Sequence, residues 1–209
     1  MSRPRPRASR VVALATVCAV VAGCGGSGAG RHTDVPAGIP ASLLAGLRTV
    51  GRGKRFLPPA TGPVLGGCRP RLGRRAESHV ELFAANHVVL IAAGVGTLAP
   101  RQLEDARVVK ARCFGLVVTL DPTGIVYVRA GAVATIGELF RSWGEPLSGT
   151  RIASFRGRQV TVYVGGRIER IAPAAVPLTP GAEIVLEVGP RVPPHRAFTF
   201  PPPPPAAMR

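Results

Sequence analysis

The residue best placed for covalent chemistry is Cys24, which ends the run Val21-Ala22-Gly23-Cys24. An aliphatic residue, then small residues, then a cysteine has the pattern of a bacterial lipobox. The small side chains let the backbone enter the narrow groove of a signal peptidase, and the thiol sulfur accepts a diacylglyceryl group. We therefore expect Cys24 to carry fatty acyl chains of the palmitate type.

The residues before Cys24 have the parts of an export signal: several arginines, an apolar segment over residues 11–21, and small residues at the end. The apolar segment is shorter than the roughly 20 residues that a membrane-spanning helix needs, so we expect residues 1–23 to be removed. Residues 24–63 are rich in Gly and Pro and predict a flexible tether. The alternative is an ordinary secretory signal that happens to end near a cysteine. The lipobox favours a protein held by lipid at the extracytoplasmic face of the cell membrane.

The cysteines that follow the lipobox predict a stabilising bond more than a catalytic group. Cys18 leaves with the signal, so that Cys68 and Cys113 remain in the domain. In an oxidising exterior they would form one disulfide, which is worth roughly 4 kcal/mol for a loop of this length. Two unpaired thiols are the alternative. Neither cysteine belongs to a Cys-x-x-Cys pair with nearby histidines, so the pattern does not predict a metal site there.

The chain is strongly basic, with 27 Lys and Arg against 11 Asp and Glu and a formal net charge of +16. Such a charge is typical of nucleic-acid-binding domains, but export argues against that partner. Only Lys54 and Lys110 are lysines, and the abundance of Arg, Ala, Gly and Pro is the usage of a GC-rich genome. The charge would then reflect codon usage on a solvated surface. The functional alternative is attraction to anionic lipid or cell-wall polymer, at about 1 kcal/mol per basic residue.

Alternating apolar residues predict strands at residues 79–84, 87–92, 116–120, 124–129, 160–164 and 183–188. The first two strands would form a hairpin around Asn86, which tolerates positive φ. The next two would form a hairpin around a type I turn, Asp121-Pro122-Thr123-Gly124. We expect the first strand to be half-buried. In the last strand, aliphatic residues would face inward, and Glu183 and Glu187 outward.

One amphipathic helix is predicted after the second hairpin. Thr135-Ile136-Gly137-Glu138 matches a capping box, and Gly144 followed by Pro146 ends the helix. Apolar residues at i, i+3, i+4 and i+7 form one stripe, composed of Ile136, Leu139, Phe140 and Trp143. Such a stripe can bind a partner, but it is typical of a helix that packs on a core.

These elements predict an α+β fold, mainly antiparallel β-hairpins packed around one amphipathic helix and loosely similar to a β-grasp unit. The globular domain would cover residues 64–192. Residues 193–209 contain a run of prolines and predict an extended, exposed tail.

Several short motifs occur together between residues 68 and 200: Cys113-Phe114, 121–126, 135–148, Pro177-Leu178-Thr179, 183–186 and Phe198-Thr199-Phe200-Pro201. In this combination the chain resembles a family of uncharacterised exported lipoproteins, many from actinobacteria. No activity is established for that family. The resemblance therefore implies export and implies no particular reaction.

Many relatives in that family have a histidine-rich first strand and a Trp-Leu-His-Thr-His-Asp segment after the second cysteine, a cluster that looks like a metal or proton-transfer site. Here the aligned residues 116–121 are Leu-Val-Val-Thr-Leu-Asp, and their apolar side chains cannot bind metal. The first strand retains His79. We expect His79 and Asp121 to be a surface pair and a candidate binding site without metal or cofactor, because zinc catalysis needs three protein ligands.

Three classes of function follow from these residues. The first is a non-catalytic β-rich binding or scaffolding domain on a lipid anchor, and it is favoured because no nucleophile, base and orienting group are recognisable together. The second is a metal-dependent or hydrolytic envelope enzyme that uses His79, Glu81 or Asp121. The third is a basic binder of anionic lipid or cell-wall polymer, which predicts arginines gathered on one face.

Overall fold

The structure is a computed structural model that describes residues 62–191 and 197–204 and the backbone of Arg48–Thr49. These residues belong to one compact unit, 34–209. The expected signal, residues 1–23, and most of the expected tether, residues 24–63, lie outside the described residues. No helix within the described part is both long enough and apolar enough to cross a bilayer.

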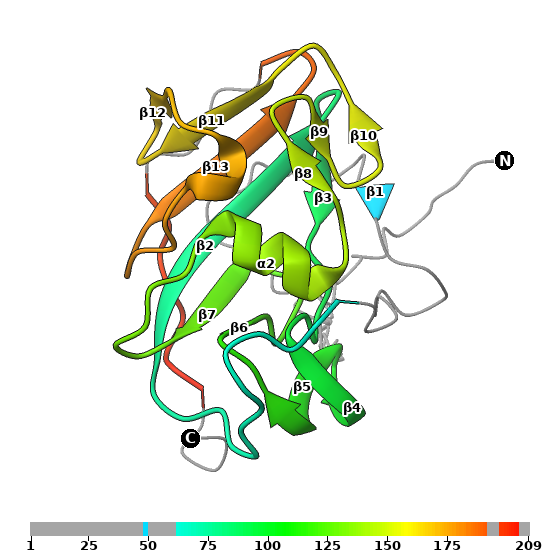
Figure 1. The fold of residues 1–209 in the computed structure, drawn as a ribbon, viewed down its shortest axis with the longest axis vertical. Coiled ribbons are helices and arrows are strands. Elements are labelled where there is room, and N and C mark those ends of the chain that lie inside the picture. Colours follow the sequence, from blue (N-terminus) through cyan, green and yellow to red (C-terminus); the bar gives the residue numbers. More distant parts are fainter. Residues whose placement is uncertain (1–47, 50–61, 192–196, 205–209) are drawn as a thin grey trace, which may run out of the picture. The chain divides into compact units, whose positions relative to one another are not determined.

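The main sheet of the described domain is mixed and has eight strands. They are β1 (Arg48–Thr49), β2 (Arg75–Ala84), β3 (His87–Leu90), β6 (Val117–Val118), β7 (Ile125–Arg129), β11 (Val160–Val164), β12 (Arg167–Glu169) and β13 (Glu183–Val188). Their order is β1-β3-β2-β13-β11-β12, with β7 also paired to β2, and β6 to β7. The long strand β2 and the last strand β13 are parallel neighbours at its centre (Figure 1).

The order β3-β2-β13-β11-β12, with one α-helix across a single face, resembles a β-grasp unit. The predicted α+β fold, with hairpins around one helix, is confirmed. The sheet departs from a purely antiparallel one at two pairs, β2 with β13 and β1 with β3.

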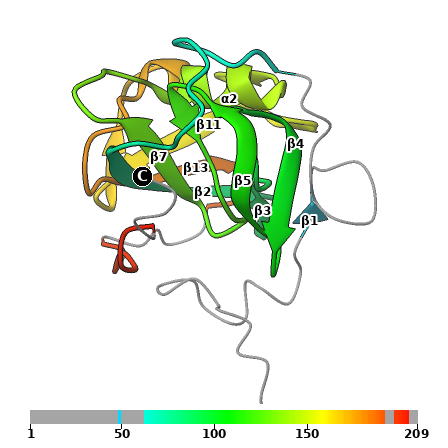
Figure 2. The same cartoon turned by 90° about the horizontal axis from the view of Figure 1, so that it is seen from below.

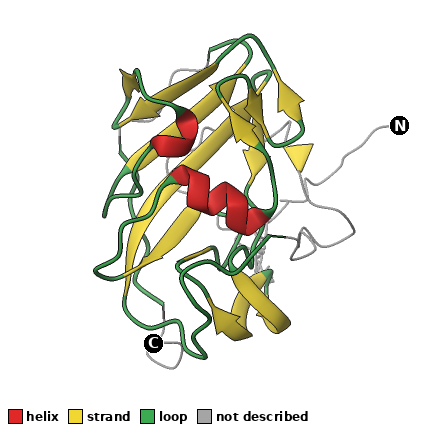
Figure 3. Cartoon of the chain, viewed as in Figure 1, coloured by secondary structure: helices red, strands yellow, loops and turns green. Residues whose placement is uncertain are grey.

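The helix α2 (Ile136–Trp143) has the predicted ends. The Thr135 amide donates to the Glu138 carboxylate at 2.8 Å, and Gly144 adopts a left-handed φ of 82° that lets its amide bond to Phe140 O. Every residue of the apolar stripe is at most 1% exposed. The stripe is therefore core, as expected. A short 3₁₀ helix, η1 (Pro173–Ala175), lies nearby (Figure 3).

Neither of the two smaller sheets was predicted. One is the hairpin of β4 (Thr97–Glu104) and β5 (Arg107–Phe114), and the other is the small sheet of β8 (Leu147–Ser148), β9 (Arg151–Ile152) and β10 (Phe155–Arg156). Most of β4 is not buried, and Pro100 and two register shifts interrupt its alternation, so it lacks the pattern of a strand. The strand predicted at 116–120 shortens to β6, because Thr119 and Leu120 bond instead to Val95 and Val108.

The core has a large cluster on the α2 side of the sheet and two smaller clusters on the opposite side. The large cluster includes Val80, Leu82, Ile136, Phe140, Trp143, Ile184 and Leu186. One small cluster joins the β4–β5 hairpin to β7 and includes Val108, Phe114, Leu120, Ile125 and Tyr127. The other contains Phe83, Val88, Tyr163 and Val185. Both faces of the central strands are therefore covered.

The predicted Cys68–Cys113 disulfide is present, with 5.3 Å between the two Cα atoms. Beside it, Arg69 and Phe114 exchange two backbone hydrogen bonds. The disulfide thus ties the segment before β2 to the end of β5, and so to the hairpin that covers one face of the sheet.

We expect the double substitution Cys68→Ser/Cys113→Ser to lower the free energy of unfolding by about 4 kcal/mol, because it opens a loop of 45 residues in the unfolded chain. Urea unfolding followed by circular dichroism measures the difference. Reductant should destabilise the wild type by a similar amount and leave the double variant unchanged. A loss below about 1 kcal/mol would contradict the role given to this bond.

Candidate functional site

A row of ionisable side chains lies on the face of the sheet opposite α2. On β2 these are Glu77, His79 and Glu81, which share one face because alternate residues of a strand point the same way. In the parallel pairing of β2 with β13, His79 lies opposite Glu183. Since paired residues point to the same face, Glu183 and Glu187 belong to this row.

The row is buried, which corrects two predictions. Strand β2 is not half-buried, because its residues from Ser78 to Ala84 are all buried. Glu183 and Glu187 do not face solvent, because they are 3% and 1% exposed. The physical reason is that β13 is a central strand, which lies between β2 and β11. The two small core clusters cover the face of the sheet that carries Glu183 and Glu187, so that this face is not open to solvent.

A part of the predicted tail also covers this face. The Phe198 ring stacks on the His79 imidazole with centroids 3.6 Å apart and 10° between planes, and Phe200 meets Phe198 edge-on at 5.1 Å. Figure 2 shows α2 on one side of the sheet and the 197–204 segment on the other. The prediction of an exposed tail is therefore wrong at Phe198, which is partly buried against the β4–β5 cluster.

Hydrogen bonds fix the orientation of the His79 imidazole. Its Nε2 lies 3.0 Å from the Thr123 carbonyl oxygen, which can only accept, so Nε2 carries a hydrogen and donates it. Its Nδ1 lies 2.7 Å from Glu183 Oε2. This bond requires one hydrogen between an imidazole nitrogen and a carboxylate oxygen.

Glu81 completes a cluster of three. One ligand atom from each of His79, Glu81 and Glu183 lies within 4.8 Å of the other two, and all three residues are buried. The Glu183 Oε1 atom is buried and has no hydrogen-bond partner among the described residues. An imidazole and two carboxylates in this arrangement can hold a proton or coordinate a cation.

Asp121, the other candidate from the sequence, supports the cluster from outside it. Its carboxylate accepts hydrogen bonds from Arg107 at 3.0 Å and from the Thr123 amide at 3.4 Å. It connects to His79 through Thr123, whose carbonyl binds the imidazole. The expected surface pair is therefore wrong, because His79 is 0% exposed and Thr123 stands between the two side chains.

Gly124 lets the 121–124 turn approach His79 closely. Its φ is +83°, in the left-handed region that favours glycine. A Cβ added there would lie 2.7 Å from Val80 O and 2.9 Å from His79 Nε2. The turn therefore needs glycine for its φ and for its contact with the imidazole.

Tyr127 and Glu77 are further ionisable groups near the 121–124 turn, at the Glu77 end of the row. Burial, with the negative charge of Asp121 as the second cause, raises the pKa of Tyr127 to about 12. Burial is also the main reason that the pKa of Glu77 is raised, while the nearby Arg107 charge lowers it. At this end the Arg107–Asp121 ion pair offsets the cost of burying charge.

Arg75 and Arg129 are among the arginines that donate to backbone carbonyls. Arg75 Nη1 donates to Gly115 O and Leu116 O, and Arg129 donates to the carbonyls of Gly66 and Gly67. Burial, then the charges of Arg129 and Arg69, lower the pKa of Arg75 to about 10. Part of the positive charge thus fastens the segment before β2.

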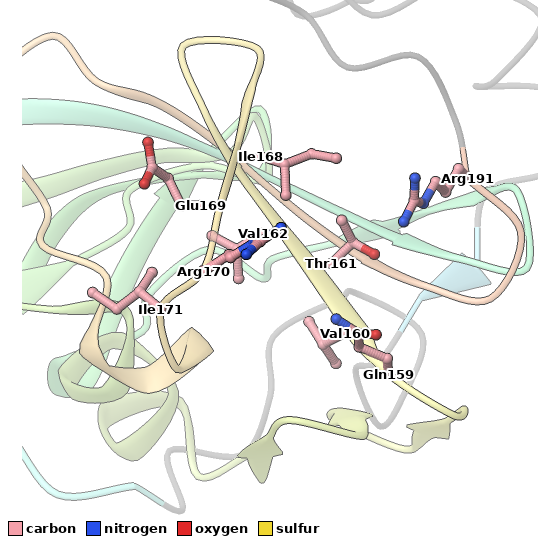
Figure 4. A pocket seen from close by; sticks show the side chains of 9 residues that line it. All are labelled: Gln159, Val160, Thr161, Val162, Ile168, Glu169, Arg170, Ile171 and Arg191. Atoms are coloured by element: carbon pink, nitrogen blue, oxygen red, sulfur yellow. The ribbon is translucent and has the colours of Figure 1, made fainter.

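A cavity of about 450 Å³ lies along the β11–β12 hairpin, and His79 is not among its lining residues. Figure 4 shows its side chains splayed to both sides of the hairpin, with Glu169 and Arg191 far apart. Ile168 and Ile171 beside it are 52% and 40% exposed. Its polar groups do not converge on one point. The cavity beside His79 is only about 20 Å³ but is next to the convergent groups.

The fold and site define an α+β domain with a buried His-Glu-Glu cluster in a mixed sheet. Comparison of the chain with protein-family models, curated proteins and solved structures finds no match.

Sequence reasoning missed three contributors to the site: Glu183, the Thr123 carbonyl and Phe198. The run Glu183–Val188 contained a usable signal, because acids inside an almost continuous aliphatic stretch are typical of a central strand covered on both faces. The other two contacts depend on tertiary approach, and no local pattern predicts them.

We expect Gly124→Ala to destabilise the domain more than Gly131→Ala does. Both glycines have positive φ, +83° and +75°, so each alanine costs about 1–2 kcal/mol of backbone strain. An added Cβ at Gly131 meets nothing within 4 Å, whereas at Gly124 it collides with Val80 O and His79. Urea unfolding of both variants measures the difference, and equal losses would show that the 121–124 turn does not press on His79.

We expect Phe198→Ala to expose His79 to diethylpyrocarbonate, which modifies accessible imidazoles, because the stacked ring is removed. Peptide mass mapping measures modification at His79, with the partly exposed His87 as an internal reference. Phe200→Ala is the matched control, because Phe200 contacts Phe198 and has no ring contact with His79. Protection of His79 in the Phe198 variant would show that other residues cover it.

Proposed function

We propose that this chain is a lipid-anchored extracytoplasmic protein whose β-rich domain binds a small ligand at the His79 cluster without transforming it. The lipid on Cys24 would hold the domain at the outer face of the cell membrane. The ligand would reach the cluster from the periplasmic or extracellular side.

The observation that carries this proposal is the burial of the cluster. His79, Glu81 and Glu183 are 0%, 3% and 3% exposed, and the cavity that His79 and Glu81 line is about 20 Å³. That volume holds about one water molecule. A general acid or base must come within hydrogen-bond reach of its substrate, which a polymeric envelope substrate does not achieve here. The arrangement therefore supports retention of a small ligand more than hydrolysis.

The cysteines support the proposed location. The Cys68–Cys113 disulfide is of the kind that persists in oxidising compartments outside the cytoplasm. The lipobox at residues 21–24 supplies an anchor for an exported chain. Membrane attachment and disulfide formation are then two results of one export event.

We expect the chain expressed in a bacterium with lipoprotein processing to incorporate alkyne-labelled palmitate, because the diacylglyceryl group carries fatty acids. Cys24→Ala should abolish this label. Cys18→Ala is the matched control and should keep it, since Cys18 lies in the segment that is removed. Intact-mass analysis should find residues 1–23 missing from the labelled protein.

Label that persists in the Cys24 variant, or an unlabelled wild type that keeps its first 23 residues, would overturn the proposed anchor.

A further inference from the structure

We propose that His79, Glu81 and Glu183 form a binding site for a divalent first-row transition-metal ion, with zinc as the best match. The inference rests on the proposed function, because it names the small ligand of the same cluster. It is carried by the convergence of three ligand atoms within 4.8 Å and by a buried carboxylate oxygen that has no partner.

The unpartnered oxygen is the first argument. Glu183 is 3% exposed, and its Oε1 makes no hydrogen bond with any described residue, although its Oε2 bonds to His79. A buried polar atom without a partner costs about 1–3 kcal/mol, and more when it is charged. Such atoms in native structures mark a place where a water or an ion belongs. A cation bound to the Glu183 carboxylate would remove this cost.

The charge of the cluster is the second argument. The cluster brings the two carboxylates of Glu81 and Glu183 within 4.8 Å of one imidazole in a buried site, and burying charge is costly. Two carboxylates and a neutral imidazole around a divalent cation are neutral together. A divalent ion would take the place of the hydrogen between His79 Nδ1 and Glu183 Oε2, and its charge would match that of the two carboxylates.

The orientation of the imidazole is the third argument. A histidine that ligates a metal usually donates its other ring hydrogen to a carboxylate or a backbone carbonyl, which fixes its tautomer. His79 does this, because Nε2 donates to the Thr123 carbonyl and Nδ1 faces the carboxylate. Asp121 and Gly124 hold Thr123 in place. The outer partners of a metal-binding histidine are thus already assembled.

The ligand set selects the kind of ion. One imidazole nitrogen and two carboxylate oxygens suit zinc, which binds such atoms at about 2.0–2.2 Å and takes three protein ligands plus a water. The ligand atoms of such a site lie roughly 3.3 Å apart, so the His79–Glu183 contact would open slightly from 2.7 Å. The cavity of about 20 Å³ that His79 and Glu81 line, and Glu183 does not, has room for about one water. Calcium requires six to eight oxygens and fits poorly.

The test is titration of the mature chain, purified in detergent and stripped with EDTA, with zinc chloride or cobalt chloride. We expect one equivalent to bind per chain, the melting temperature to rise, and cobalt to give the intense visible absorption of a four-coordinate site. Calcium and magnesium chloride should give none of these effects.

The variants Glu183→Gln and Glu81→Gln should each weaken zinc binding by about 100-fold or more, because each loses a charged ligand. Glu187→Gln is the matched control. Glu187 is buried on the same strand and the same face, but it lies outside the cluster, so its variant should bind as the wild type does. The melting temperature of each metal-free variant shows that the variant is folded before binding is compared.

Absence of stoichiometric binding by the wild type would overturn the metal site, as would equal zinc affinity in the wild type and the Glu183 variant. Failure of this inference is distinct from failure of the proposed anchor, because palmitate labelling at Cys24 is read separately. A labelled protein that binds no metal would retain its proposed place and lose its proposed ligand.

Discussion

The contact between His79 on β2 and Glu183 on β13 is the interaction on which the polar face of this domain depends. It joins residues 104 positions apart and lies where the first long strand and the last strand run parallel at the centre of the sheet. A pair of ionisable groups in this position is stable only if its charges are compensated. Every element around it contributes to that compensation or keeps water away.

Three parts of the chain meet at this pair. The 121–124 turn brings the Thr123 carbonyl to Nε2, and Asp121 fixes that turn to Arg107 at the start of β5. The disulfide and the Arg75 and Arg129 contacts hold the segment before β2 against the same region. Phe198 closes the imidazole face. The β4–β5 hairpin, which no local pattern predicted, is thus part of the cover of the site.

The helix side of the sheet was predictable, because its signals are local. The capping box, the glycine that ends the helix and the spacing of Ile136 and Trp143 all lie within ten residues, and the structure bears each of them out. The disulfide also followed from the number of cysteines and the expected export. The polar face was not predictable in the same way. Alternating glutamates in 183–188 look like an exposed face until β13 is known to lie between two other strands.

The candidate site was therefore found in part. His79 and Asp121 were expected to form a surface pair, but Thr123 links them, and the partner of His79 comes from the far end of the domain. Apolar residues at 116–120 indicated that a histidine-based site was absent. The structure instead places two carboxylates beside a single imidazole, and such a set arises only from strand pairing.

The most direct measurement is a crystal structure of the protein purified from its native host without chelator, with anomalous data collected on both sides of the zinc absorption edge. We expect one anomalous peak about 2 Å from His79 Nδ1 and from a carboxylate oxygen of Glu81 and of Glu183. A map with no peak at the cluster, and with Glu183 Oε1 bonded to a water or a protein donor, would contradict it.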